Sequence, residues 1–299
     1  MNPATSTNPH PRNIGHNRQM SGLPIPNIPL NNGVEIPQLG FGTYKVPKDE
    51  ATTLVARALE IGYRQVDTAQ MYRNERAVGQ GIAASGVPRA EVFLTTKLNN
   101  AFHRHGDALA AFDRSLTELG TDYVDLFLIH WPLPAIDLYP EAWGALEEIY
   151  ASGRARAIGV SNFQPNHLAR IIETGTVIPA VNQIEVHPYM TQADVRVVNA
   201  AHGIVTQAWS PLGRAAVLDD AVICGIAARY GVTPAQAVLR WHIQRGDVII
   251  PKSSSPARLA QNADLFGFEL TDDDMAAITV LNQNRRRGSH PDDENRLDR

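Results

Sequence analysis

The sequence predicts an α/β fold, a single (β/α)8 barrel of the TIM type preceded by a short N-terminal β-hairpin. Short apolar runs alternate with amphipathic stretches along the chain, and there are eight such runs. They recur about every 25 to 45 residues, and their nearly continuous apolar character is typical of a parallel sheet covered by helices. The length of 299 residues suits closure of the sheet, because one such barrel needs roughly 250 residues.

The domain organisation follows from where this pattern begins and ends. Residues 1–26 are rich in Asn and Pro and lack an apolar run, so they are expected to form a disordered arm rather than a signal peptide or a membrane helix. Residues 27–284 are expected to form the barrel and residues 285–299 a tail. Met20 directly precedes the patterned region, and we hypothesise that it is the natural start.

The hairpin and the eight strands are predicted from local composition. Residues 28–30 and 34–36 flank Asn31-Asn32-Gly33, and Asn-Gly tolerates the positive φ of a tight turn. The eight strands are expected at residues 39–42, 64–67, 92–98, 123–130, 155–160, 180–183, 204–208 and 248–250.

Helices are expected between these strands. Apolar side chains recur at helical spacing, as at Leu109, Phe112, Leu116 and Leu119. Helix starts are marked by Thr233 before Pro234, by Ser255 before Pro256, and by Thr271 three residues ahead of Asp274.

An open, doubly wound sheet is the alternative fold. It would be expected to carry a glycine-rich dinucleotide-binding turn. Gly40 and Gly42 are followed by Thr43, Tyr44 and Lys45 instead of a third glycine. The barrel is therefore the favoured fold.

Composition limits the partners and the compartment. The net charge of −4 and the lack of a long basic stretch argue against nucleic acid or an anionic membrane as the main partner. Cys224 is the single cysteine and cannot form an internal disulfide, so nothing demands an oxidising compartment and a cytoplasmic protein is expected. We also expect a monomer that acts on a small molecule. We expect no metal, because His103 and His105 lack companion ligands and are typical of solvated loop histidines.

Polar side chains follow almost every predicted strand. Active sites of such barrels form where the carboxyl ends of the strands meet. The residues at these ends are Asp67, Lys97, His130-Trp131-Pro132, Ser161-Asn162, Gln183, Trp209-Ser210 and Lys252-Ser253-Ser254. Together they predict one site at that end of the barrel.

Three of these segments resemble the signatures of the aldo-keto reductase superfamily. The first is the run from Gly62 to Gly79, which contains Asp67, Tyr72, Asn74 and Glu75. The second is residues 123–132, and the third is residues 250–253 with Arg258 and Asn262. The similarity extends over residues 28–284 and is greatest to bacterial reductases, including the 2,5-diketo-gluconate reductases.

Reduction of a carbonyl group by a nicotinamide requires a hydride for carbon and a proton for oxygen. Tyr72 is the expected proton donor, with Lys97 as the cation that makes the phenol more acidic and Asp67 as the partner of Lys97. His130 is expected to bind the carbonyl oxygen. The resemblance implies the same four roles. Considered singly, Tyr72 could be a packing residue, Asp67 and Lys97 a structural ion pair, and His130 a core histidine.

The end of the eighth strand is the expected phosphate site. Lys252, Ser253, Ser254 and Arg258 surround a helix start near Ser255, and helix amino ends attract phosphate. Two cations there favour NADPH over NADH. Trp209 is expected to stack on the nicotinamide. The resemblance adds cofactor contacts at Thr43, Ser161, Asn162, Gln183, Ser210, Pro211, Leu212, Gly213, Ile250, Gln261 and Asn262.

Tyr44, His130 and Trp131 are the expected substrate-binding residues. They favour compact carbonyl compounds such as α-dicarbonyls and diketo sugar acids. The tail is short and is expected to add little wall to the pocket, and His187 is expected to be structural.

Two other functions stay open. A noncatalytic subunit that only binds the cofactor would keep the fold. An aldolase or isomerase that forms a Schiff base on Lys97 would not use NADPH.

Overall fold

The computed structural model describes residues 24–297. Its main sheet has eight parallel strands, and each strand pairs with its neighbour in the sequence. These strands are β3 (Phe41–Gly42), β4 (Gln65–Asp67), β5 (Phe93–Leu98), β6 (Leu126–Ile129), β7 (Ile158–Ser161), β8 (Val181–Glu185), β9 (Val205–Trp209) and β10 (Val248–Ile249).

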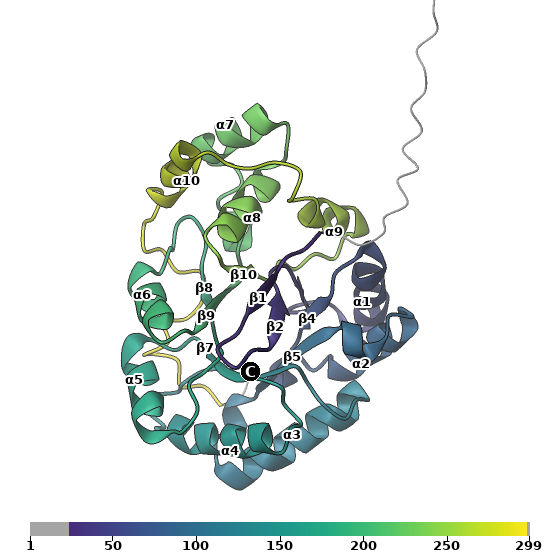
Figure 1. Ribbon diagram of the computed structural model, residues 1–299, viewed down its shortest axis with the longest axis vertical. Coiled ribbons are helices and arrows are strands. Elements are labelled where there is room, and N and C mark those ends of the chain that lie inside the picture. The colour runs from purple at the N-terminus through teal and green to yellow at the C-terminus, as the bar shows by residue number, and fades with distance from the viewer. Residues whose placement is uncertain (1–23, 298–299) are drawn as a thin grey trace, which may run out of the picture.

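The two edges of the sheet meet and close it into a barrel. Leu39 forms a parallel bridge with Ile249, next to the first and last strands. Beside this bridge, the side-chain amide of the buried Gln38 donates to the carbonyl oxygens of Ile243 at 2.8 Å and Asp247 at 3.1 Å. The predicted (β/α)8 barrel is confirmed, and the open-sheet alternative is wrong (Figure 1).

Helices surround the barrel, and several begin where their caps predict. The helices are α1 (Lys48–Ile61), α2 (Glu75–Ala84), α3 (His105–Leu119), α4 (Tyr139–Ala151), α5 (Pro165–Thr174), α6 (Ala193–Ala201), α7 (Ala221–Tyr230), α8 (Pro234–Gln244), α9 (Pro256–Ala263) and α10 (Asp272–Thr279). The side chains of Thr233, Ser255 and Thr271 accept from backbone N–H groups in the first turns of α8, α9 and α10, which confirms the three predicted starts.

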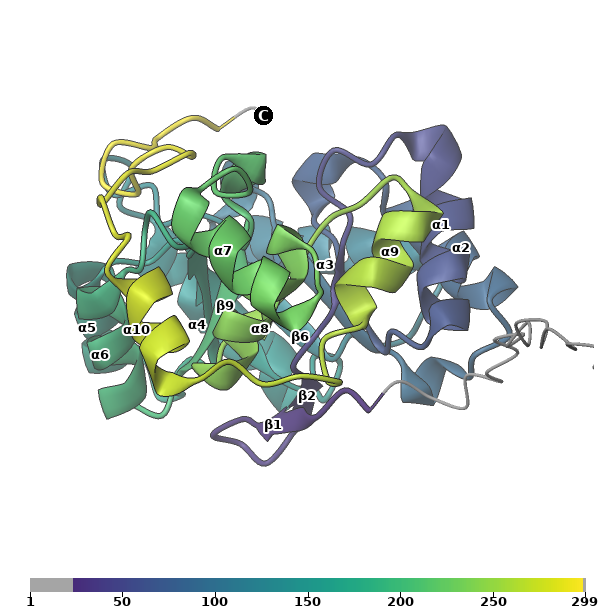
Figure 2. The same ribbon diagram turned by 90° about the horizontal axis from the view of Figure 1, so that it is seen from above.

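The hairpin lies at the amino ends of the strands. Its strands β1 (Asn27–Pro29) and β2 (Glu35–Pro37) pair antiparallel as predicted. Leu30 and Ile36 pack against Phe93, Leu126 and Leu128, so the hairpin covers this end of the barrel. In Figure 2 the hairpin lies at the bottom, and the yellow C-terminal segment crosses the opposite end.

The expected N-terminal arm falls largely outside the described residues, as does Met20. Pro26, at its inner end, accepts a hydrogen bond of 2.8 Å from the backbone of Gln38. Within residues 24–297, no single helix is long and apolar enough to cross a membrane, and only the sharply bent pair α7 and α8 meets that test on length and composition.

Candidate active site

A cavity of about 740 Å³ opens at the carboxyl ends of the strands, at the end of the barrel opposite the hairpin. It brings together most of the polar groups that the sequence places after strands. The predicted residues that line it are Tyr44, Asp67, Tyr72, His130, Trp131, Ser161, Asn162, Gln183, Trp209, Ser210, Ile250 and Lys252.

Lys97 lies beneath this cavity and is fully buried. Its ammonium group donates to Asp67 Oδ1 at 2.6 Å and to the Thr68 carbonyl at 2.9 Å. The third contact of Lys97 Nζ is the Tyr72 hydroxyl at 3.4 Å. The three donors of the ammonium thus face one carboxylate, one carbonyl and one phenol, which joins three of the four predicted catalytic residues.

The segment that carries Tyr72 is fixed by its neighbours. Tyr72 ends a 3-10 turn, Gln70–Tyr72, directly after β4. Asn74 donates to the Thr43 carbonyl at 3.1 Å and accepts from the Thr68 hydroxyl at 2.8 Å. Glu75 accepts a hydrogen bond of 2.6 Å from Thr96 on β5. These contacts hold the phenol beside Lys97.

Burial and charge act against ionisation of Tyr72. Burial raises the pKa of the phenol well above its usual value, and the nearby Asp67 and Tyr44 raise it further. We expected Lys97 to make the phenol more acidic. The carboxylate of Asp67 lies 2.6 Å from the Lys97 ammonium and partly offsets its charge at the phenol. The raised pKa keeps the proton on the Tyr72 hydroxyl at neutral pH.

The Asp67–Lys97 pair is held in a dry environment. Burial raises the pKa of Asp67 and lowers that of Lys97, and each group's charge opposes the other's shift. Gln183 donates a further hydrogen bond of 2.7 Å to Asp67 Oδ2. Both carboxylate oxygens therefore have a donor, which compensates for the lost water.

His130 completes the group on the other side of Tyr72. The two rings meet edge to face, with centroids 5.7 Å apart. Tyr44 approaches Tyr72 from the open side with a centroid distance of 5.1 Å and is 45% exposed. A carbonyl oxygen in the cavity would therefore find the phenol and the imidazole side by side.

The residues at the ends of β7 and β9 form a connected set. Asn162 donates to the His130 carbonyl at 2.9 Å and accepts from the Trp209 indole at 2.8 Å. The Ser161 hydroxyl donates to the Gln183 carbonyl at 2.9 Å. Asn162 thus fixes the edge of the Trp209 ring, a contact that the sequence did not predict.

The expected phosphate site surrounds the start of α9. Ser255 caps the helix, Ser253 bonds to Ser255, and Lys252 and Arg258 extend from this turn as exposed cations. Neutral and cationic donors with no carboxylate among them fit a phosphate group. The other expected cofactor residues lie outside the cavity lining; they are Thr43, Pro211, Leu212, Gly213, Ser253, Ser254, Arg258, Gln261 and Asn262.

The structure adds residues that sequence reasoning missed. Gly42, Met71, Arg214, Arg287, Gly288, Ser289 and Arg296 also line the cavity. The expectation that the tail adds little wall is wrong, because four of these seven residues come from residues 287–296. The tail crosses the cavity mouth and is hydrogen-bonded to distant loops, as where Asn100 donates to the Arg296 carbonyl at 2.8 Å.

His103 also differs from expectation. We expected a solvated loop histidine, but its ring is 2% exposed, and burial lowers its pKa to about 4. The loop that precedes α3 folds inward and buries it. His105, the first residue of α3, keeps an exposed ring.

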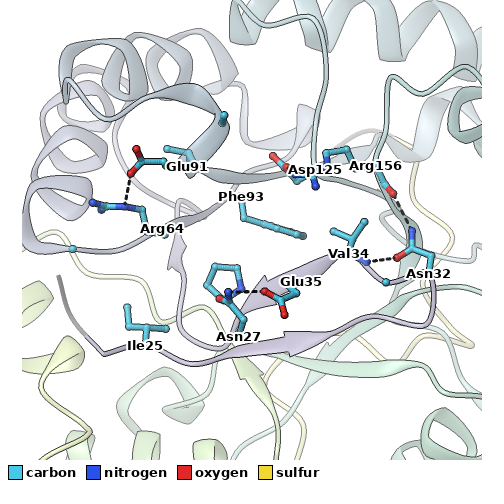
Figure 3. Close-up of a pocket in the computed structure, with 15 residues that line it drawn as sticks. Ile25, Asn27, Asn32, Val34, Glu35, Arg64, Glu91, Phe93, Asp125 and Arg156 are labelled. Atoms are coloured by element: carbon cyan, nitrogen blue, oxygen red, sulfur yellow. Dashed lines mark hydrogen bonds and ion pairs between the residues drawn. The ribbon is translucent and has the colours of Figure 1, made fainter.

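A second cavity of about 680 Å³ lies between the hairpin and the amino ends of β4 and β5 (Figure 3). Its charged groups already have partners, such as Arg156 with Asp125 at 2.9 Å and Arg64 with Glu91 at 3.9 Å. These charged groups therefore pair with one another. In the cavity at the carboxyl ends of the strands, by contrast, the polar side chains point together into the open space.

Comparison with known proteins identifies the family. Residues 38–283 match the model of the aldo/keto reductase family. The chain is 49% identical to an aldo-keto reductase of Mycolicibacterium smegmatis, over 89% of this chain and 97% of that one. It is 46% identical to methylglyoxal reductase DkgA of Escherichia coli K12, over 89% and 96%. The crystal structure of a Gox0644 mutant in complex with NADPH matches with a TM-score of 0.87 and 44% identity, covering 90% of this chain and 98% of that one. The chain belongs to the aldo/keto reductase family.

Proposed function

We propose that this protein reduces small aldehydes and ketones with NADPH. The observation that carries the proposal is the buried ammonium of Lys97, which contacts both Asp67 and Tyr72 below an open cavity. An ion pair with only a structural role would have no need of a phenol and an imidazole at the cavity wall. Bound NADPH would supply the hydride to the carbonyl carbon.

The side chains of the protein would supply the proton and the orientation. Tyr72, protonated at neutral pH, would donate from its hydroxyl to the carbonyl oxygen as negative charge develops there. Lys97 would stabilise the resulting phenolate through the contact of 3.4 Å that it already makes. His130 would hold the substrate oxygen beside the Tyr72 hydroxyl.

The cofactor would lie between β9 and the start of α9. Trp209 would stack on the nicotinamide ring, and Ser161, Asn162 and Gln183 would surround its carboxamide. Thr43, Ser210, Pro211, Leu212, Gly213 and Ile250 would line the path to the phosphates. Lys252, Ser253, Ser254 and Arg258 would hold the 2′-phosphate, with Gln261 and Asn262 at the adenine. The two exposed cations at this turn support NADPH over NADH.

The cavity favours a compact substrate. Tyr44 and Trp131 line it, together with residues 287–289 and Arg296 of the tail. α-Dicarbonyl compounds and diketo sugar acids fit this space, and the relative from Escherichia coli is named for methylglyoxal. The enzyme would act as a cytoplasmic monomer.

The test is the absorbance of NADPH at its reduced-nicotinamide band, followed after addition of methylglyoxal or a diketo sugar acid. Loss of absorbance that depends on the enzyme is expected, with a smaller rate when NADH replaces NADPH. An enzyme that binds NADPH but consumes none with any member of a carbonyl panel would contradict the proposal. Trapping of substrate on Lys97 by borohydride would support the Schiff-base alternative instead.

A further inference from the structure

One buried carboxylate of the barrel accepts two hydrogen bonds from the backbone of the C-terminal tail. Glu185, the last residue of β8, accepts hydrogen bonds from the backbone N–H groups of Arg287 at 2.6 Å and Gly288 at 2.9 Å. Its third partner is His187 Nε2, at 3.1 Å. The side chains of Glu185 and His187 are both 0% exposed. The carboxylate is thus satisfied by two tail amides and one imidazole.

This arrangement is electrostatically favourable. Burial alone would raise the pKa of Glu185, but the hydrogen bonds from His187, Gly288 and Arg287 outweigh it and hold the pKa below its usual value. Hydrogen bonds to a charged acceptor are roughly twice as strong as neutral ones. Residues 287–288 of the tail are therefore held by charge-assisted hydrogen bonds.

These same residues lie against the ring expected to stack on the nicotinamide. A Cβ atom on Gly288 would approach Trp209 Cη2 to 2.6 Å and Glu185 Oε2 to 3.2 Å. Only glycine allows the tail to pass this close. The nitrogen of the same indole donates the hydrogen bond of 2.8 Å to Asn162, which follows β7. Trp209 is consequently held between β7 and the tail.

We propose that Glu185, supported by His187, is a positioning residue that holds the tail at the end of β8. Through the tail it would fix the position of the tail residues that line the cavity and the position of the Trp209 ring. Glu185 does not line the cavity, whereas Arg287, Gly288 and Ser289 do. It acts through the segment that it holds. This proposal concerns the same site as the proposed carbonyl reduction. Only its kinetic test depends on that activity.

The first experiment measures the tail directly. Hydrogen exchange of the full-length protein is compared with that of Glu185→Gln, which keeps the shape but loses the charge. The amides of Arg287 and Gly288 are expected to exchange about tenfold faster or more, because each loses its hydrogen bond to a charged acceptor. Amides in β5 and β6 should keep their wild-type rates. Asp292→Asn is the matched control, because Asp292 is a tail carboxylate that lies 3.3 Å from His167 and makes no contact with Glu185.

The second experiment separates positioning from chemistry. In Glu185→Gln, KM for the carbonyl substrate is expected to rise at least several-fold while kcat at saturation changes less. Gly288→Ala should also raise KM, because it displaces the tail while Glu185 is unchanged. Asp292→Asn should leave KM unchanged.

Three outcomes would overturn the inference. They are unchanged exchange at residues 287–288, faster exchange throughout the barrel in both variants, and a looser tail with wild-type KM. If the wild-type protein reduces no carbonyl, the proposed function fails, but the exchange result still decides whether Glu185 holds the tail.

Discussion

Tyr72 gains its expected role from its surroundings. An isolated tyrosine is a weak acid, and burial here makes it weaker still. The proton can leave only when a stronger base, the developing alkoxide, lies beside the hydroxyl and Lys97 can stabilise the phenolate. The buried ammonium is thus expected to stabilise the negative charge that Tyr72 acquires as its proton leaves.

Tyr72→Phe tests this role at the level of one oxygen atom. Removal of the hydroxyl should lower kcat by about 10²- to 10⁴-fold, the usual contribution of a positioned general acid. Steady-state rates with methylglyoxal measure the loss, and the dissociation constant of NADPH should stay within a factor of two or so of wild type. A variant with the wild-type rate would exclude Tyr72 as the proton donor.

Arg258→Met tests recognition of the 2′-phosphate. The exposed guanidinium lies in the first turn of α9. Its loss should weaken the binding of NADPH by about tenfold or more and leave the binding of NADH nearly unchanged. Dissociation constants for both cofactors, measured by fluorescence titration, decide the matter. Equal weakening of the two would contradict phosphate recognition.

The candidate catalytic residues could be predicted from the sequence because each lies at, or a few residues after, the carboxyl end of a strand. Asp67 ends β4, Lys97 lies in β5, and His130 follows β6, so the order of strands places them together. Arg214 and Arg287 could not be predicted in the same way. Their positions depend on a loop and a tail whose paths are set by distant contacts, such as the bonds to Glu185.

At the level of elements, caps were predicted more reliably than strand ends. A cap is a local contact, as at Thr233 and Gln236, whose side chains bond each other's backbone N–H groups. Strand ends depend on neighbours far along the chain. Residues 155–157 were expected in a strand, but Ala155 makes only an isolated bridge to Val124, and regular pairing of β7 starts at Ile158.

Thr233→Ala should therefore destabilise the protein by about 1 kcal/mol, because the first turn of α8 loses its side-chain acceptor. The midpoint and slope of urea unfolding measure this change. Thr233→Ser, which keeps the hydroxyl, is the matched control and should stay close to wild type. An alanine variant as stable as the serine variant would show that the cap contributes nothing.

At the level of the whole molecule, stability should depend on the buried His103. Its folded pKa of about 4 lies below the ordinary 6.5, so between these values the unfolded chain binds more protons than the folded one. The free energy of unfolding should rise by about 3 kcal/mol from pH 4 to pH 6.5 through this group and stay flat above.

His103→Phe should remove this part of the pH dependence, whatever its effect on absolute stability. Urea unfolding at several pH values gives the slope. His105→Phe is the control, because that ring is 44% exposed. An undiminished slope in the His103 variant would show that another group is responsible.

The contact between the first and the last strand, which closes the barrel, has a consequence for synthesis of the chain. Gln38 bonds the carbonyl of Ile243, 205 residues further on, and the Leu39–Ile249 bridge lies beside it. A ribosome that has released the first strands has not yet made the partner of their free edge. While the later βα units are made, the edge of β3 stays unpaired. Unpaired strand edges are prone to associate with other chains. We therefore expect the two ends of the sheet to pair late, after the last strand has been made.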